Sequence, residues 1–282
     1  MSVRIDSHQH FWSIKRGDYG WLTPETGPIY RDYSPADLIP LLMRNGIDKT
    51  ILVQAAPTQA ETHFMLGLAE VTPFIAGVVG WSDFEAKDAA WRIADLARNK
   101  MLVGLRPMVQ DLADAKWLAR PELSPAFDAM VDAGLIFDAL VLPKHLNALA
   151  AMMARHPDLP VVIDHVAKPH LRKGISDRFW DEMAELARMP QCVCKLSGLL
   201  TEASDGAGID ILKPVFKKLH ALFGSERLLW GSDWPVLTLA ASYDDWFAMA
   251  QKMTQGLSAS ERDAIFGDNA KRVYLSGRGR AL

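Results

Sequence analysis

The sequence predicts an α/β protein, a single-domain (β/α)8 barrel of the TIM type, in which eight parallel strands alternate with helices. Short runs rich in β-branched residues alternate with longer amphipathic segments, which is typical of consecutive βαβ units. The chain has 282 residues, and one such barrel takes about 250, so residues 1–282 are expected to form one domain. The expected strands are residues 3–8, 50–55, 74–80, 102–106, 134–140, 160–165, 191–197 and 227–231.

Helix signals fill the intervals between these strands. Residues 85–99 and 178–188 are amphipathic and are expected as helices. Another helix is expected to begin at Ser34-Pro35-Ala36-Asp37, where a capping serine, a proline at the first position and an acid follow one another. Gly46 is expected to end that helix before the second strand.

Composition excludes several classes of protein. The chain is 49% hydrophobic and 23% charged, as globular domains are, and its formal net charge is −3. Without a surplus of basic residues, a nucleic-acid partner is not expected. No apolar run approaches the roughly 18 residues of a membrane span, and the first residues lack a signal-peptide pattern. Cys192 and Cys194 are expected as reduced, buried thiols in a cytoplasmic protein, and a homo-oligomer remains open.

The strongest chemical signal is the pair His8 and His10 at the end of the first strand. Residues two apart on a strand point to the same face, so both imidazoles should project into the barrel mouth, with Asp6 one layer deeper. Two adjacent imidazoles can bind a divalent metal ion, or polarise a carbonyl group without one.

A second histidine signal ends the sixth strand. The same periodicity would place Val161, Ile163 and His165 on one face, with His165 at the mouth. The alternative is a histidine buried in the core. Lys168 and His170 follow in the next loop; both are candidates to line the mouth, and His170 could equally be a surface residue.

An acid ends the last strand. Asp233 follows Leu229 and Gly231 on the expected inward face, and Pro235 stops the strand. A carboxylate there can act as a metal ligand, as a general base, or as both. The alternative is that Asp233 caps the next helix.

Further candidates for the site come from strand ends and from long loops. Segments 12–33 and 198–210 follow the first and seventh strands, at the end of a barrel where active sites lie, and are expected as lids or binding loops. Aromatic faces can pack on sugar rings, and polar side chains can bind hydroxyl groups, although the polar ones could instead form ion pairs within the barrel. The expected substrate-binding residues are Gln54, Arg106, Asp138, Lys195, Trp12, Trp81 and Trp234.

These motifs, in this order, resemble the amidohydrolase superfamily, and within it the amidohydrolase-2 branch, which includes sugar lactonases and a pyrone-dicarboxylate lactonase. Binuclear members carry a modified lysine on the fourth strand, where this sequence has Arg106. The resemblance therefore implies one metal ion at most. The motifs are Asp6-Ser7-His8-Gln9-His10-Phe11-Trp12, Asp164-His165-Val166-Ala167-Lys168-Pro169, Lys195-Leu196-Ser197-Gly198, Gly231-Ser232-Asp233-Trp234-Pro235 and Asn269-Ala270.

The resemblance implies a hydrolase that opens a small-molecule sugar lactone to the aldonic acid. Asp233 would take the proton from the attacking water. His8, His10 and His165, either alone or with Asp233 around one divalent ion, expected to be zinc, would polarise the carbonyl oxygen. Two alternatives remain at this point: a metal-dependent decarboxylase of an aromatic or unsaturated acid on the same scaffold, and a non-catalytic barrel that binds a sugar acid.

Overall fold

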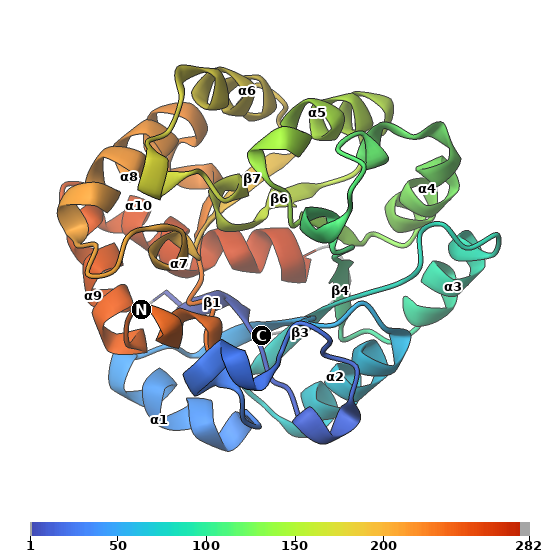
Figure 1. Ribbon diagram of the computed structural model, residues 1–282, viewed down its shortest axis with the longest axis horizontal. Coiled ribbons are helices and arrows are strands. Elements are labelled where there is room, and N and C mark those ends of the chain that lie inside the picture. Colours follow the sequence, from blue (N-terminus) through green and yellow to red (C-terminus); the bar gives the residue numbers. More distant parts are fainter. Residues whose placement is uncertain (1, 277–282) are drawn as a thin grey trace.

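The computed structural model describes residues 2–276 and confirms the (β/α)8 barrel (Figure 1). The strands lie in chain order around the sheet, and each consecutive pair is parallel. All eight fall within or next to the expected ranges. They are β1 (Ile5–Gln9), β2 (Lys49–Val53), β3 (Ile75–Gly80), β4 (Leu102–Leu105), β5 (Ile136–Ala139), β6 (Val161–Ile163), β7 (Cys192–Leu196) and β8 (Leu228–Trp230).

The ring of strands closes where the end of β1 meets the segment after β8. The backbone N–H of His10 donates to the carbonyl of Trp234 at 2.8 Å, and the N–H of Asp233 donates to the carbonyl of His8 at 2.8 Å. Two of the sequence motifs are therefore joined to each other by backbone hydrogen bonds.

Helices surround the strands in an outer ring, as expected for this fold (Figure 1). The helix signals at Ser34 and Gly46 are confirmed, because the N–H of Ser34 donates to Asp37 Oδ2 at 2.8 Å and Gly46 ends the helix with φ of 62°. The expected helix at 85–99 is shorter than its pattern. The helices are α1 (Pro35–Asn45), α2 (Gln59–Val71), α3 (Ala89–Leu96), α4 (Ser124–Asp132), α5 (Leu146–Arg155), α6 (Asp177–Ala187), α7 (Leu199–Glu202), α8 (Ile209–Phe223), α9 (Tyr243–Met253) and α10 (Ala259–Asp263).

The C-terminal segment closes the barrel at the end where the strands begin. It continues from α10 through Leu275 and crosses the middle of the ring (red in Figure 1). Tyr274 and Leu275 pack in the same apolar cluster as residues of the barrel interior. Gly267 allows this close approach, because a Cβ there would lie 1.9 Å from the carbonyl oxygen of Val3.

The expected faces of two strands are corrected by the structure. The register of β1 shifts between Asp6 and Gln9, so Asp6 does not share the inward face of His8. Its carboxylate instead accepts a hydrogen bond from the Tyr243 hydroxyl of α9, at 3.0 Å. On β6, Val162 belongs to the interior cluster, whereas Val161 and Ile163 pack in the cluster that the helices cover.

On β7, Val193 packs inward, whereas Cys192 and Cys194 pack outward and are the free, buried thiols that the sequence predicted. Among the described residues, no helix is long and apolar enough to span a membrane.

Candidate active site

A cavity of about 210 Å³ opens at the carboxyl ends of the strands. Its volume suits a small molecule rather than a polymer. Four predicted site residues lie in its wall, and so does Lys168, whereas His170 does not. The lining residues are His10, Trp21, Ala55, Arg106, Met108, Gln110, Asp111, Leu140, His165, Lys168, Asp233 and Val236.

Three imidazoles converge on one carboxylate oxygen. Oδ1 of Asp233 lies 3.6 Å from Nε2 of His8, 3.2 Å from Nε2 of His10 and 3.8 Å from Nε2 of His165. The other oxygen, Oδ2, has no hydrogen-bond or ion-pair partner among residues 2–276, and 7% of the side chain remains exposed. The structure thus brings together the four residues that the sequence selected as the centre of the site.

Each imidazole is fixed on its far side by a different group. Nδ1 of His10 lies 2.8 Å from the carbonyl oxygen of Val53, which can only accept, so this nitrogen carries the proton. Nδ1 of His165 lies 2.9 Å from the hydroxyl of Ser197. Nδ1 of His8 lies 3.3 Å from Oδ1 of Asp164. Metal-binding histidines are commonly oriented in this way by a carbonyl, hydroxyl or carboxylate behind the ring.

His165 reaches the site through an unusual backbone. β6 ends at Ile163, and His165 and Val166 have φ of 51° and 56°, in the left-handed region. This turn breaks the alternation of the strand, so Asp164 and His165 both face the interior polar groups. The strand periodicity correctly predicted that His165 lies at the site, but it assigned the wrong face of β6 to the barrel interior. It also missed Asp164.

Burial sets the charge of these groups. It lowers the pKa of His165 to about 4, although Asp233 and Asp164 act in the opposite direction. Burial also lowers the pKa of His8 well below its usual value. For Asp233 burial would raise the pKa, but the surrounding imidazoles of His165, His10 and His8 hold it below its usual value. At neutral pH the site therefore combines the neutral imidazoles of His8 and His165 with the ionised carboxylate of Asp233.

This donor set fits one divalent cation. Ligand atoms of His8, His165 and Asp233 all lie within 4.8 Å of one another. Four ligands at about 2.0–2.1 Å from a tetrahedral zinc ion are about 3.3 Å apart, close to the separations around Asp233 Oδ1. Neutral imidazole nitrogens and a carboxylate are also ligands that zinc accepts.

Beneath the imidazoles lies a buried network of charges. Nζ of Lys195 lies 2.5 Å from Asp138 Oδ2 and 3.0 Å from Asp164 Oδ1, and NH1 of Arg106 lies 3.2 Å from Asp164 Oδ2. Lys195 and Asp138 are fully buried and outside the cavity lining, which agrees with the ion-pair alternative for these two residues. Arg106 lines the cavity, and its Nε donates to Oε1 of the buried Gln54 at 3.0 Å.

The predicted aromatic residues lie behind the wall rather than in it. Trp12 and Trp234 are buried and both pack edge-on against Tyr33, and the backbone of Trp81 is bonded to Thr62. Trp21 lines the cavity instead. It packs perpendicular to Trp12, and its Nε1–H donates to the carbonyl of Ala55 at 2.7 Å. The aromatic residues of loop 12–33 indicated that the loop contributes to the site, but they did not indicate which tryptophan faces the cavity.

Sequence reasoning also missed most of the cavity wall opposite the histidines. Met108, Gln110 and Asp111 follow β4, and Leu140 and Val236 follow β5 and β8. These positions carry no motif; only their place after a strand end could have marked them. Four further histidines lie outside the cavity lining: His63, His145, His156 and His220.

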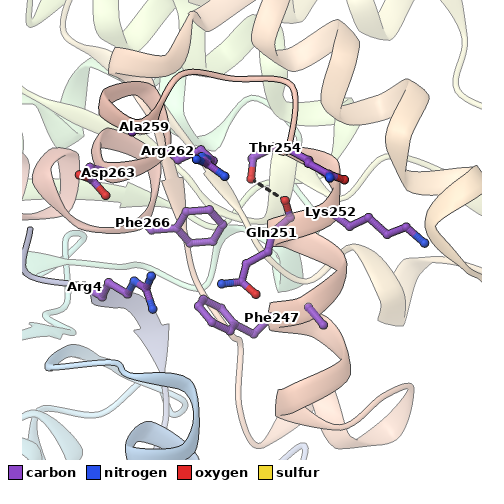
Figure 2. Close-up of a pocket in the computed structure, with 11 residues that line it drawn as sticks. Arg4, Phe247, Gln251, Lys252, Thr254, Ala259, Arg262, Asp263 and Phe266 are labelled. Carbon is purple, nitrogen blue, oxygen red and sulfur yellow. Dashed lines mark hydrogen bonds between the residues drawn. The ribbon is translucent and has the colours of Figure 1, made fainter. Parts of the chain in front are cut away.

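A larger cavity, of about 500 Å³, lies at the opposite end of the barrel, beside Arg4 and the end of α9 (Figure 2). Arg4 lies 5.9 Å from the ring centroid of Phe247, and Phe266 completes the apolar floor. Apart from the buried Thr254, its polar side chains are exposed to solvent. It contains none of the convergent, buried polar groups that distinguish the smaller cavity, which we therefore consider the candidate active site.

Comparison with known proteins agrees with this assignment. The sequence profile described as Amidohydrolase matches residues 5–275. An L-fucono-1,5-lactonase of Burkholderia ambifaria is 45% identical over 99% of this chain and 97% of its own length, and one of Burkholderia multivorans is 39% identical over 97% and 96%. A crystal structure of an amidohydrolase from Burkholderia multivorans with bound zinc is 37% identical, with a TM-score of 0.92 over 97% of this chain and 99% of that one. The protein belongs to the amidohydrolase family.

Proposed function

We propose that this protein is a lactonase, a carboxylic ester hydrolase that opens a sugar-derived lactone such as L-fuconolactone to the aldonic acid. Two relatives that match nearly the whole chain are named L-fucono-1,5-lactonases. The cavity of about 210 Å³ has a size that suits a sugar lactone. The decarboxylase alternative is not favoured by these relatives, and the convergence of four polar groups argues against a barrel that only binds.

The observation that carries the proposal is the difference in surroundings between the two oxygens of the Asp233 carboxylate. Oδ1 faces the three imidazoles, while Oδ2 has no partner among the described residues. In the proposed reaction, water attacks the lactone carbonyl carbon, and Oδ2 takes a proton from that water. When the bond to the ring oxygen breaks, Asp233 returns the proton to the leaving alkoxide. A lactone has a better leaving group than an amide, so one carboxylate base is sufficient.

We propose that His8, His165 and Asp233 hold one divalent ion, zinc in the first instance, with His10 as a further ligand. The bound ion would polarise the carbonyl group and stabilise negative charge on its oxygen. In a neutral His10 the proton on Nδ1 leaves only a lone pair on Nε2, and this nitrogen then cannot donate to that oxygen. Metal-independent action would instead require a protonated imidazole.

Substrate contacts are assigned to the remaining wall. Arg106 presents a guanidinium that can donate to hydroxyl oxygens, and Trp21 offers an aromatic edge and face. We further propose that the enzyme acts in the cytoplasm, in carbohydrate metabolism, and that the whole chain, residues 1–282, is one domain; the free buried cysteines fit a reducing compartment. Assembly into a homo-oligomer stays a prediction.

A pH-indicator assay against a panel of aldonolactones tests the proposal, because hydrolysis of a neutral lactone releases acid. Metal analysis and assay after chelation should be run in parallel. We expect hydrolysis of at least one six-carbon lactone and no more than one tightly bound ion per chain. Carbon dioxide release from aromatic acids, with no lactone hydrolysed, would overturn the proposal in favour of the decarboxylase. Full activity in a metal-free sample would support the proposed lactonase activity and contradict the proposed metal ion.

A further inference from the structure

A line of buried polar groups runs through the barrel from the C-terminal segment to the site. The hydroxyl of Tyr274 donates to the Asp138 carboxylate, with distances of 2.8 Å to Oδ1 and 3.0 Å to Oδ2. The same carboxylate lies 2.5 Å from Nζ of Lys195. Tyr274 is 3% exposed, and Asp138 and Lys195 are fully buried. None of the three lines the cavity, so none can touch the substrate directly.

Lys195 continues this line of buried groups to His8, one of the three histidines of the site. Its Nζ lies 3.0 Å from Oδ1 of Asp164 and 3.2 Å from Nδ1 of His8. Asp164 Oδ1 lies 3.3 Å from the same ring nitrogen. The two carboxylates of Asp138 and Asp164 balance the charges of Lys195 and Arg106, and buried charges of this kind need all their partners in place.

The contacts of His8 hold its ring in one orientation. Nδ1 faces the buried charges, with Nζ of Lys195 at 3.2 Å and Oδ1 of Asp164 at 3.3 Å. Nε2 faces the opposite way, with NH1 of Arg106 at 3.3 Å and Oδ1 of Asp233 at 3.6 Å. This orientation depends on Asp164 staying against the ring, and Lys195 is one of the two cations that hold Asp164 there.

We propose that Tyr274 is a positioning residue, which acts through Asp138 and Lys195 to keep Asp164 against Nδ1 of His8 and so to orient Nε2 toward Asp233. The C-terminal segment is then part of the catalytic apparatus as well as the floor of the barrel. The effect on rate rests on the proposed lactonase function. The effect on the surroundings of the His8 ring does not.

The kinetic test compares Tyr274→Phe with Asn269→Ala. Asn269 is buried in the same C-terminal segment and donates to the carbonyls of Ser225 and Leu228 at 2.7 and 2.8 Å, but it has no bond to the buried line. Both variants should lower the melting temperature. Only Tyr274→Phe should lower kcat, by roughly 10-fold, as loss of an outer-shell partner does, with KM within about twofold of the parent. Equal kcat in the two variants would overturn the proposal.

The second test needs no substrate. Long-range ¹H–¹⁵N NMR spectra of the histidine rings report the protonation and surroundings of each ring nitrogen, and we expect the same His8 signals in the parent and in Asn269→Ala. In Tyr274→Phe these signals should shift or broaden; unchanged His8 signals would overturn the proposal. If Tyr274→Phe does not fold, the same two tests can be made with Asp138→Asn, which keeps the shape of the Asp138 side chain and removes its charge. A parent that hydrolyses no lactone refutes the function, while the spectra still test the positioning role.

Discussion

Nε2 of His10 lies 3.2 Å from Oδ1 of Asp233, although the two residues are 223 positions apart in the chain. The backbone of His10 is bonded to the carbonyl of Trp234 at the junction that closes the barrel. Closure of the fold therefore places the proposed base, Asp233, next to its nearest imidazole. Flexibility of this junction would separate them, so the geometry of the site depends on the same hydrogen bonds that complete the ring of strands.

Replacing Asp233 with Asn should remove the base while keeping the shape of the side chain. We expect kcat to fall on the order of 10²–10⁴-fold, the usual contribution of a positioned acid–base group, and KM to change much less. Steady-state kinetics with the best lactone of the panel measures both. A folded Asp233→Asn variant within about threefold of the parent would mean that Asp233 is structural and that the chemistry begins with the histidines.

Ser197→Ala tests whether the orientation of His165 matters. The hydroxyl lies 2.9 Å from Nδ1 of His165, and its loss frees the ring to rotate. We expect activity to fall about 10-fold, within the range measured for outer-shell partners. The matched control is Ser225→Ala, which removes another serine–histidine contact, 2.9 Å from His220 and outside the cavity lining. Comparable losses in both variants would argue for a general effect on folding.

Trp21→Ala should weaken substrate binding. Loss of about 1.4 kcal/mol of aromatic contact would raise KM about tenfold while the base and the imidazoles stay in place. Trp91→Ala is the control, because Trp91 is 67% exposed on α3 and does not line the cavity. A fall in kcat at unchanged KM would show that Trp21 acts on the chemical step instead.

The pH profile of the enzyme should follow its buried imidazoles. Since burial lowers the pKa of His165 to about 4, this ring stays neutral well below its ordinary value of 6.5. Activity should therefore be nearly constant from pH 8 to about 5 and fall toward pH 4, as measured by kcat/KM in buffers of constant ionic strength. An acid limb centred near pH 6.5 would show that an imidazole with an ordinary pKa controls the rate.

Stability should respond to the same shift. Between about pH 4 and 6.5 the unfolded chain binds a proton at His165 that the folded chain does not. The contribution of His165 to folding stability must therefore decrease as the pH falls through this window. Urea unfolding of the parent and of His165→Asn at pH 5 and 7 isolates the contribution of His165 to the free energy of unfolding. The parent should lose more stability than the variant on acidification.

The parts of the fold and of the site that could be predicted from the sequence are those that follow a regular periodicity. Alternating β and α patterns are local, so the strand ranges and the barrel were predictable. His8 and His10 were predictable because they lie at or next to the end of β1, and Asp233 because it lies shortly after the end of β8. The face of Asp6 was not, since a shift in the pairing of β1 with β2 leaves no mark in the sequence.

The remaining errors come from side chains whose partners are distant in the chain. Asp164 faces Lys195 and Arg106 only because a left-handed turn follows β6. Trp21 faces the cavity, and Trp12 does not, because loop 12–33 packs Trp12 beneath it. Neither arrangement follows from composition or spacing, because both depend on how loops settle on the finished barrel.

Gly198, directly after the residue that orients His165, provides the sharpest test of how closely the site is packed. It has φ of 63° at the start of α7, and a Cβ added there would lie 2.5 Å from Nδ1 of His165. Gly206 is the matched control, with φ of 73° and no atom within 4 Å of an added Cβ. Alanine at either position should cost about 1–2 kcal/mol of folding free energy, because both backbones are left-handed.

Only Gly198→Ala should also displace His165. We expect its kcat to fall on the order of 10²-fold, which a misplacement of about 1 Å can cause, while Gly206→Ala keeps the kcat of the parent. Chemical denaturation and steady-state kinetics of the two variants separate backbone strain from movement of the ring. If both variants lose stability equally and neither loses activity, His165 has room to move, and its position relative to Asp233 does not limit the rate.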